Sequence, residues 1–259
     1  MLMATTREIS PSIQSCELTH LARAPIDLDL ARAQHADYEW ALVEAGCTVR
    51  RLHAEPDMPD SVFVEDIAVV FDEFAAITRP GAESRRAETP AVIDALSRVQ
   101  SLHFRPLVMI EEPGTLDGGD VLVIGRRVFV GSSRRTNGAG FDQLRGMLMH
   151  VGYSVLAVPV DGCLHLKSAV TAIAPDAVLI NRDWVPAEVF AGLELVDVHP
   201  AEPYAANALL VGDRVVYPAA FPRTRERLEG RGLTVRPVDV GELAKAEGAV
   251  TCCSLIFDV

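Results

Sequence analysis

The chain has 259 residues and a formal charge of −12, from 24 basic and 36 acidic side chains, and 49% of its residues are hydrophobic. This composition excludes a disordered or fibrous chain, and the acidic balance argues against a nucleic-acid partner or an anionic membrane face. Five irregularly spaced cysteines, two of them adjacent, indicate a reducing compartment rather than a disulfide framework. We find no signal peptide and no apolar run of about 18 residues, and therefore expect a soluble, cytoplasmic protein with no membrane contact.

A unit of a strand pair, a helix and a further strand recurs along the chain. A helix over 27–45 and a strand over 48–52 come first. Four complete units follow, with strand pairs over 62–70/75–78, 121–124/128–130, 166–174/177–180 and 206–211/215–217. Their helices are predicted over 89–99, 137–150, 185–191 and 223–228, and their last strands over 107–110, 154–160, 193–198 and 233–238. A final strand is predicted over 250–257.

The spacing of these units predicts a repeat architecture. Their first strands begin near residues 63, 120, 165, 206 and 250, and the last one would join the N-terminal helix to complete a fifth unit. A ring closed in this way leaves no sheet edges between units. We therefore predict a five-bladed, pseudo-symmetric α/β propeller that forms a single domain over residues 1–259. An ordinary mixed α/β sheet also fits the order of the elements.

Three carboxylates bracket the first predicted strand. Asp60 and Asp66 have the same parity and would face one cavity, whereas Glu65 would point the opposite way. Paired buried carboxylates need a compensating cation, and a guanidinium group supplies one in planar, bidentate form. Considered alone, this segment is more typical of carboxylates that cap turns at strand ends.

Two further segments place polar residues at the ends of predicted strands. Leu-Asp-Gly-Gly-Asp sets Asp117 beside glycines that allow a close approach of backbone, although simple turns use the same residues. His165 begins a predicted strand, with Leu164 and Leu166 on the opposite face. A single histidine is more often a packed or surface residue. Cys163 and His165 lack the second ligand pair of a structural zinc site, so we expect no metal.

Cys252 and Cys253 are adjacent on the last predicted strand, so one thiol would lie in the core and the other would face the axis. A nucleophilic cysteine needs a lowered pKa and a partner histidine, whereas a buried structural cysteine is the more common case. Arginines at 85–86 and 134–135 could bind a carboxylate or lie at the surface.

Together, these segments resemble the dimethylarginine dimethylaminohydrolases of the guanidino-group-modifying pentein superfamily. The resemblance covers residues 18 to 257 and is carried by Pro-Asp-Ser-Val-Phe-Val-Glu-Asp, Ile-Thr-Arg-Pro-Gly-Ala-Glu-Ser-Arg-Arg, Leu-Asp-Gly-Gly-Asp, Arg-Thr-Asn, Leu-His-Leu-Lys, Tyr-Ala-Ala-Asn and Thr-Cys-Cys-Ser. It implies a five-bladed α/β propeller that hydrolyses asymmetric dimethylarginine or monomethylarginine to citrulline and dimethylamine or methylamine. It implies no cofactor and a small-molecule partner, and leaves monomer and homodimer open.

The resemblance also implies roles for individual residues. Cys252 would be the nucleophile that forms a covalent thiouronium, His165 the general acid and base, and Asp117 the carboxylate that orients His165. The substrate would be bound by Asp60, Glu65 and Asp66 at the guanidinium, Arg85 and Arg135 at the α-carboxylate, Leu18 on a loop that closes over it, and Ala246 through its backbone. Cys253 is hypothesised to be a non-catalytic thiol.

Three other kinds of function remain open at this point. Arginine deimination and amidino transfer use the same cysteine, histidine and carboxylate chemistry, although the chain is short for those relatives. The ribosome anti-association factors share the superfamily fold without this chemistry, and they would not require Cys252, His165 and Asp117 together. A catalytically inactive arginine sensor is the third possibility.

Overall fold

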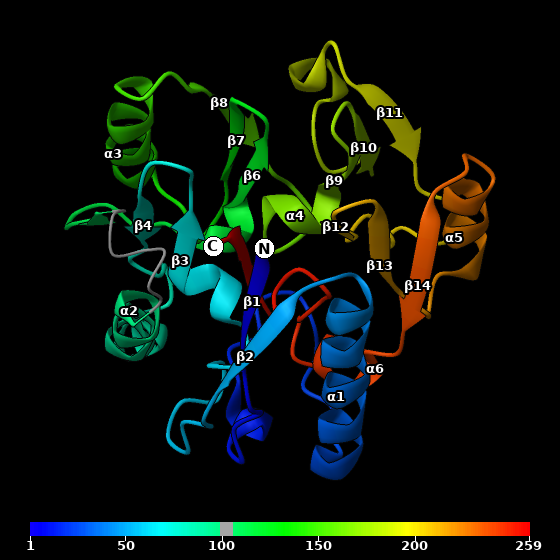
Figure 1. Ribbon diagram of the computed structural model, residues 1–259, viewed down its shortest axis with the longest axis horizontal. Helices are drawn as coiled ribbons and strands as arrows, with labels where there is room; N and C mark the ends of the chain where they lie inside the picture. Colours follow the sequence, from blue (N-terminus) through cyan, green and yellow to red (C-terminus); the bar gives the residue numbers. More distant parts are fainter. Residues whose placement is uncertain (99–105) are drawn as a thin grey trace.

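The computed structural model describes residues 1–98 and 106–259. Within these ranges the strands form five three-stranded sheets, which are arranged around a common centre (Figure 1). In each sheet the middle strand pairs antiparallel with the first strand and parallel with the third. A parallel pair needs a crossover connection, which explains why a helical segment lies between the second and third strands of every unit.

The elements repeat in the same order in all five units. The first strands are β3 (Ala68–Val70), β6 (Val121–Ile124), β9 (Val170–Ala174), β12 (Leu209–Val211) and β15 (Leu255–Asp258). The middle strands are β4 (Ala75–Ile77), β7 (Arg127–Ser132), β10 (Ala177–Ile180), β13 (Arg214–Pro218) and β1 (Leu2–Arg7). The third strands are β5 (Leu107–Met109), β8 (Ser154–Pro159), β11 (Glu194–Asp197), β14 (Thr234–Val238) and β2 (Thr48–Leu52).

The helical segments fall into two groups. Those in the crossovers are α1 (Leu28–Glu44), η3 (Glu83–Glu88) with α2 (Thr89–Ser97), α3 (Gly138–Met149), the 3₁₀ turn η6 (Ala187–Phe190) and α5 (Pro222–Glu229). The short helix η1 (Ile13–Ser15) precedes α1 in the same crossover, and η2 (Val64–Ile67), η5 (Gly118–Asp120), α4 (Leu166–Ala169) and α6 (Gly241–Ala244) lie in the other connections.

The helices begin at residues that favour helix initiation. The Asp27 carboxylate accepts hydrogen bonds from two backbone N–H groups in the first turn of α1, and Asn137 caps α3 in the same way. Proline occupies the first turn of α2 and of α5, where its missing N–H is not needed. The predictions for these four helices are confirmed to within about two residues, except that Val99 lies outside the described residues.

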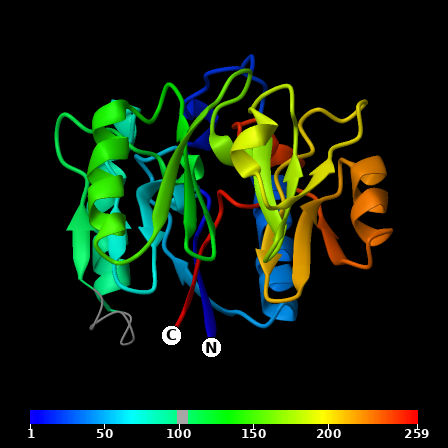
Figure 2. The same cartoon turned by 90° about the horizontal axis from the view of Figure 1, so that it is seen from above.

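The fifth sheet joins the two ends of the chain, as predicted, but its middle strand is β1, a strand that the sequence analysis did not predict. β15 and β2 pair with its two edges, so the termini lie side by side (Figures 1 and 2). The last four residues of β1 are all buried. Because both faces are covered, this segment lacks the alternation of apolar and polar residues that marks a half-exposed strand.

Several predicted elements are corrected by the structure. The strand predicted over 62–70 begins with η2, the one over 166–174 begins with α4, and those over 206–211 and 250–257 start only at Leu209 and Leu255. Segments of about four residues, such as η2 and α4, are too short for periodicity to distinguish a strand from a helical turn. The helix predicted over 185–191 is the 3₁₀ turn η6.

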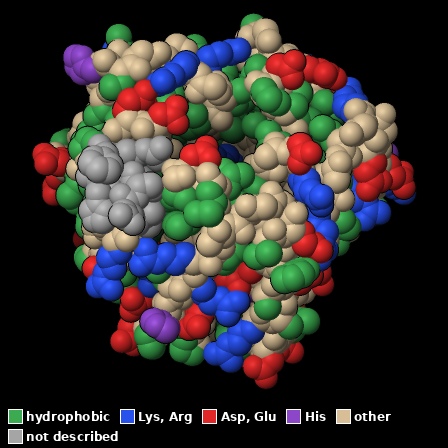
Figure 3. All heavy atoms as spheres, in the orientation of Figure 1, with side chains coloured by type: hydrophobic (Ala, Val, Ile, Leu, Met, Phe, Trp, Pro, Cys, Tyr) green, Lys and Arg blue, Asp and Glu red, His purple; other side chains and the backbone are tan. Residues whose placement is uncertain are grey.

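The surface is consistent with an acidic protein of mixed surface charge. On the face seen in Figure 3, acidic and basic side chains are interspersed among hydrophobic ones. In the described part of the chain, every helix is too short or too polar to cross a bilayer.

Aromatic packing between neighbouring elements supplies a test of the core. Phe190 in η6 is fully buried, and its ring lies 4.8 Å from that of Phe129 in β7. We expect Phe190→Ala to lower the free energy of unfolding by roughly 3–5 kcal/mol, measured by chemical denaturation, because the side chain leaves a cavity. Met149→Ala, at an exposed site on α3, should change it by less than about 0.5 kcal/mol. Equal effects of the two substitutions would contradict this packing.

Candidate active site

Separate connections of the five units enclose a small cavity of about 20 Å³. Seven of the ten residues predicted for the site line it: Asp60, Asp66, Arg85, Arg135, His165, Ala246 and Cys252. Glu17 also lines it and belongs to the N-terminal loop, the connection of residues 8–27 between β1 and α1, which crosses the end of the molecule opposite the chain termini (Figure 2). The volume is enough for about one water molecule, so the loop is closed in this structure.

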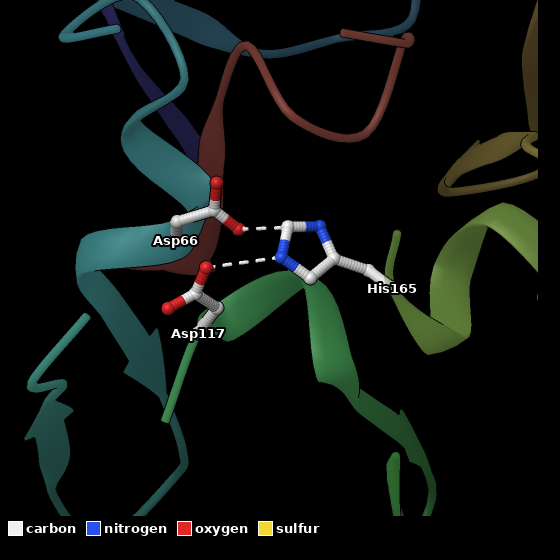
Figure 4. A group of neighbouring side chains, drawn as sticks. All are labelled: Asp66, Asp117 and His165. Atoms are coloured by element: carbon white, nitrogen blue, oxygen red, sulfur yellow. Dashed lines mark hydrogen bonds and ion pairs between the residues drawn. The ribbon is translucent and has the colours of Figure 1, made fainter. Parts of the chain in front are cut away.

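His165 lies between two carboxylates that come from different units (Figure 4). Its Nε2 is 3.0 Å from Oδ2 of Asp117, and its Nδ1 is 3.9 Å from Oδ1 of Asp66. All three side chains are buried. The prediction that His165 begins a strand is wrong, because the residue precedes α4 as its N-cap. The structure places Asp117 and His165 in direct contact through this hydrogen bond.

Two glycines allow this close approach. A Cβ atom at Gly118 would lie 1.9 Å from the carbonyl oxygen of Glu65. At Gly119 it would lie 2.7 Å from Nδ1 of His165 and 2.9 Å from Oδ1 of Asp66. The Gly119 N–H also donates to Asp66. Gly118 is therefore required by packing against the backbone of Glu65, and Gly119 by packing against the imidazole and Asp66, beyond the needs of a turn.

Asp120 is a site residue that the sequence analysis did not single out. Its buried carboxylate accepts hydrogen bonds from the hydroxyls of Ser133 and Thr136 and from the backbone N–H of Leu166. The last bond fixes the segment that carries His165. The position of Asp120 at the end of the Leu-Asp-Gly-Gly-Asp segment was the sequence feature that could have identified this residue. Burial raises the pKa of Asp120 to about 6, although His165 and the two hydroxyls oppose this effect.

The carboxylates determine the charge of the imidazole. Burial alone would lower the pKa of His165, but the charge of Asp66 and the hydrogen bond to Asp117 outweigh it and raise the pKa to about 9. Burial pushes the pKa of Asp66 upward, whereas His165 and Arg85 lower it to about 2. Near neutral pH the site therefore holds an imidazolium and an ionised Asp66.

The two adjacent cysteines occupy different environments, as predicted, although they lie in a turn before β15 rather than on a strand. Cys252 borders the cavity, while Cys253 is fully buried in the core, and both are free thiols. Burial raises the pKa of Cys252 well above its usual value, and the charges of Glu65 and Asp66 add to this effect. The thiol is therefore neutral when no cation occupies the cavity.

Glu65 and Asp66 do not alternate across a strand, because η2 replaces it. Glu65 turns away from the cavity and accepts hydrogen bonds from Nζ of Lys167 at 2.6 Å and from Oγ1 of Thr251 at 2.8 Å. Thr251 in turn is held by Asn207. In this structure Glu65 therefore ties the turn that carries Cys252 to the segment that carries His165.

The two arginines differ in how far their donors are already used. Arg85 is buried and donates to Asp66 at 2.5 Å, to both oxygens of Glu88 and to backbone carbonyls. Arg135 donates one hydrogen bond to Oγ1 of Thr19 and lies 3.9 Å from Asp117. Arg85 therefore supports the Asp66 carboxylate, and Arg135 has more donors available for a ligand.

Asp60 and the N-terminal loop meet at the cavity. Both Asp60 carboxylate oxygens accept from the backbone N–H of Glu17, the residue before Leu18. Burial raises the pKa of Asp60 to about 6, against the opposing charge of Arg85. Leu18 packs on the core outside the cavity wall, and Ala246 follows α6 in the wall itself.

Asp66, Asp117 and His165 also form a cluster whose potential ligand atoms lie within 4.8 Å of one another. The Asp66 oxygens are already bonded to Arg85 and Gly119, and Asp117 accepts from Gly81. The guanidinium of Arg85 beside these atoms would repel a divalent cation. The donor set therefore fits an ion-pair network better than a metal centre.

A larger cavity, of about 330 Å³, adjoins the first one. Leu164, Glu247 and Gly248 border both cavities. Its other walls include Leu21 of the N-terminal loop, Tyr204 and Phe221, and it carries none of the predicted catalytic residues. The smaller cavity is therefore where chemistry is expected.

In this α/β fold a thiol, an imidazole and a carboxylate meet in one cavity. This set of side chains is typical of enzymes that use covalent catalysis. The family model described as eukaryotic N,N dimethylarginine dimethylhydrolase matches residues 21–191. A dimethylarginine dimethylaminohydrolase of Streptomyces coelicolor is 44% identical over 255 residues, covering 97% of this chain and 95% of the relative. The chain therefore belongs to the dimethylarginine dimethylaminohydrolase family, as the resemblance predicted.

Two solved structures support this assignment. The enzyme of Pseudomonas aeruginosa, in a cysteine-to-serine mutant complexed with citrulline, has a TM-score of 0.91 at 34% identity and covers 98% of both chains. A histidine-to-glycine variant of a dimethylarginine dimethylaminohydrolase, as an adduct with S-methyl-L-thiocitrulline, also has a TM-score of 0.91 at 34% identity. It covers 99% of this chain and 100% of that chain.

The imidazole charge can be tested by nuclear magnetic resonance. We expect the His165 ring signals to titrate with a pKa of about 9. Asp117→Asn should lower this pKa by roughly one pH unit or more, because it removes a carboxylate that favours the charged imidazole. Asp142→Asn, at an exposed site on α3, is the control and should leave it unchanged. A His165 titration that is unaffected by Asp117→Asn would contradict the pairing.

Proposed function

We propose that this chain hydrolyses Nω-methylated arginines, namely asymmetric dimethylarginine and monomethylarginine, to citrulline and dimethylamine or methylamine. The observation that carries the proposal is the single cavity in which the Cys252 thiol, the imidazolium of His165 and the carboxylates of Asp60 and Asp66 meet. The citrulline complex and the thiocitrulline adduct of the family members support a substrate of this class.

The proposed reaction begins when the substrate guanidinium enters beside Asp60 and Asp66. Burial and the charges of Glu65 and Asp66 raise the pKa of the Cys252 thiol, so a bound cation that neutralises Asp66 favours loss of the thiol proton to solvent. The Cys252 thiolate then attacks the guanidinium carbon and forms a neutral tetrahedral intermediate. The fixed orientation of the cation supplies proximity for this attack.

Collapse of the intermediate breaks the bond to the methylated nitrogen. His165, already protonated, donates its proton to the leaving amine, and a cationic thiouronium remains on Cys252. Neutral His165 then accepts a proton from water, and the resulting hydroxide attacks the thiouronium carbon. Expulsion of the Cys252 thiolate, with loss of the new hydroxyl proton to solvent, gives citrulline, and solvent returns a proton to the thiolate. Asp117 holds Nε2 and stabilises the imidazolium that forms again.

The remaining binding roles follow from the free donors and acceptors. We propose that Arg135, with support from Arg85, binds the substrate α-carboxylate, and that Leu18 and Ala246 contact the substrate from the loop and from the wall. Glu65 is proposed to assist guanidinium binding indirectly, because its hydrogen bonds with Lys167 and Thr251 position the segments beside the cavity. The cavity is too small for the substrate in its present form, so the N-terminal loop opens for entry.

We propose a five-bladed propeller that forms one domain over residues 1–259, since five sheets lie around one centre. Five free thiols favour a reducing, cytoplasmic location. A small-molecule substrate is the partner we propose, with neither nucleic acid nor membrane, in a monomer or a homodimer.

The reaction and the nucleophile are tested by citrulline formation from asymmetric dimethylarginine, monomethylarginine and free arginine. We expect turnover of the methylated substrates by the wild type and by Cys253→Ala, and a loss of at least about 10³-fold in Cys252→Ala because the nucleophile is absent. Mass spectrometry of acid-quenched Cys253→Ala should find the thiouronium on the peptide that contains Cys252.

Each alternative has its own result in this assay. Faster turnover of free arginine, with release of ammonia, would change the assignment to a deiminase. No turnover of any of the three substrates would leave a binding protein. Loss of activity in Cys253→Ala but not in Cys252→Ala would reverse the roles of the two thiols.

The pH dependence follows from two buried groups. Catalysis should decline as pH rises through about 9, since His165 loses the proton that it donates. It should also decline as pH falls through about 6, because protonated Asp60 no longer attracts the guanidinium. In profiles of kcat/KM, Asp60→Asn should remove the acidic limb, and Asp117→Asn should move the alkaline limb to lower pH. Limbs that do not respond to these variants would contradict the assignments.

A further inference from the structure

The N-terminal loop is held closed by backbone hydrogen bonds to two carboxylates on opposite sides of Leu18. On one side, Asp60 accepts from the N–H of Glu17. On the other side, Glu247 accepts from the N–H groups of the three residues that follow Leu18. Leu18, which the proposed function places against the substrate, therefore lies between two anchors, only one of which was predicted to be part of the site.

The Glu247 carboxylate fills a cradle of consecutive backbone N–H groups. Oε2 accepts from Thr19 at 2.9 Å, and Oε1 accepts from His20 at 2.5 Å and from Leu21 at 2.6 Å. Successive N–H groups that converge in this way form an anion-binding nest, and hydrogen bonds to an ionised acceptor are about twice as strong as neutral ones. One side chain thus fixes three residues of the loop.

The backbone of Glu247 is also unusual. Its φ is +58°, and it is the one non-glycine residue with a positive φ among residues 1–98 and 106–259. It follows α6, where a residue in this conformation is usually glycine or asparagine, and a glutamate there is strained. Gly248 comes one position too late to relieve the strain. The three hydrogen bonds that its carboxylate accepts offset this cost.

Glu247 is also well placed to link the loop to the site. It lines the small cavity next to Ala246 and lies five residues before Cys252. On the far side of the loop, Arg135 donates to Oγ1 of Thr19. The closed loop is therefore bound to both walls of the cavity.

We propose that Glu247 is a positioning residue that latches residues 19–21 over the cavity and thereby sets the position of Leu18 against the bound substrate. The latch holds the loop in the absence of substrate, and its effect on substrate binding rests on the proposed function. Glu247 takes no part in bond making, so its loss affects KM far more than kcat.

The test uses the full chain and three substitutions of Glu247. Glu247→Gln keeps the shape of the side chain, Glu247→Ala removes the carboxylate, and Glu247→Gly removes it while relieving the positive φ. Glu202→Gln is the matched control, because Glu202 also accepts from successive backbone N–H groups, those of Arg223 and Thr224, which belong to α5 and not to the loop. Thermal unfolding of each variant checks that it folds.

Two readouts are expected to change together. The rate of tryptic cleavage after the exposed Arg23, without substrate, should rise about tenfold in all three Glu247 variants, because the loop opens more often. KM for asymmetric dimethylarginine should also rise about tenfold, with kcat within about threefold of the wild type. Glu202→Gln should leave both readouts unchanged.

Glu247→Gly separates a latch from a purely structural role. A variant of wild-type or higher stability that still shows raised KM and faster cleavage supports the latch. Cleavage and KM within about twofold of the wild type in both Glu247→Gln and Glu247→Gly would overturn it. If the wild type turns over no methylated arginine, the proposed function fails, while the cleavage rates still decide whether Glu247 holds the loop.

Discussion

A buried imidazolium surrounded by carboxylates is the interaction on which the rest of the site depends. Each ion removed from water costs several kcal/mol unless partners compensate it. His165 is compensated by Asp117 and Asp66, and Asp66 by Arg85. Because Asp117, Asp66 and Arg85 are also hydrogen-bonded to backbone groups, the network fixes both the position and the charge of the imidazole.

The fold makes this network possible because each member comes from a different part of the chain. Asp66 lies in η2 before β3, Asp117 precedes η5, and His165 precedes α4. These segments occupy equivalent places before the first strands of three neighbouring units, so the repeat brings them together. The glycines at 118 and 119 then permit contact distances that a Cβ atom would prevent. The arrangement of the units brings these three residues together, and the turns that carry them orient their side chains.

These irregular turns also limited what could be predicted from the sequence. The repeating unit, the long helices and most strands follow from periodicity and helix caps, and the motifs identify seven cavity residues and Asp117. The apolar residues 62–64 led the sequence analysis to predict a strand where η2 forms, and the burial of both faces of β1 removes the alternation that would have predicted that strand. The parts played by Asp120 and Glu247 depend on hydrogen bonds from backbone N–H groups distant in sequence, which no local pattern specifies.

In the proposed mechanism, the same carboxylates both suppress and enable the nucleophile. With no cation in the cavity, burial and the charges of Glu65 and Asp66 keep Cys252 a neutral thiol, a form that reacts slowly with oxidants and electrophiles. The imidazolium of His165 cannot act as the base that deprotonates it. A guanidinium bound beside Asp66 neutralises part of this negative charge and lowers the pKa of the Cys252 thiol, so the substrate itself activates the nucleophile. The selectivity for cationic substrates and the protection of the thiol thus arise from one electrostatic arrangement.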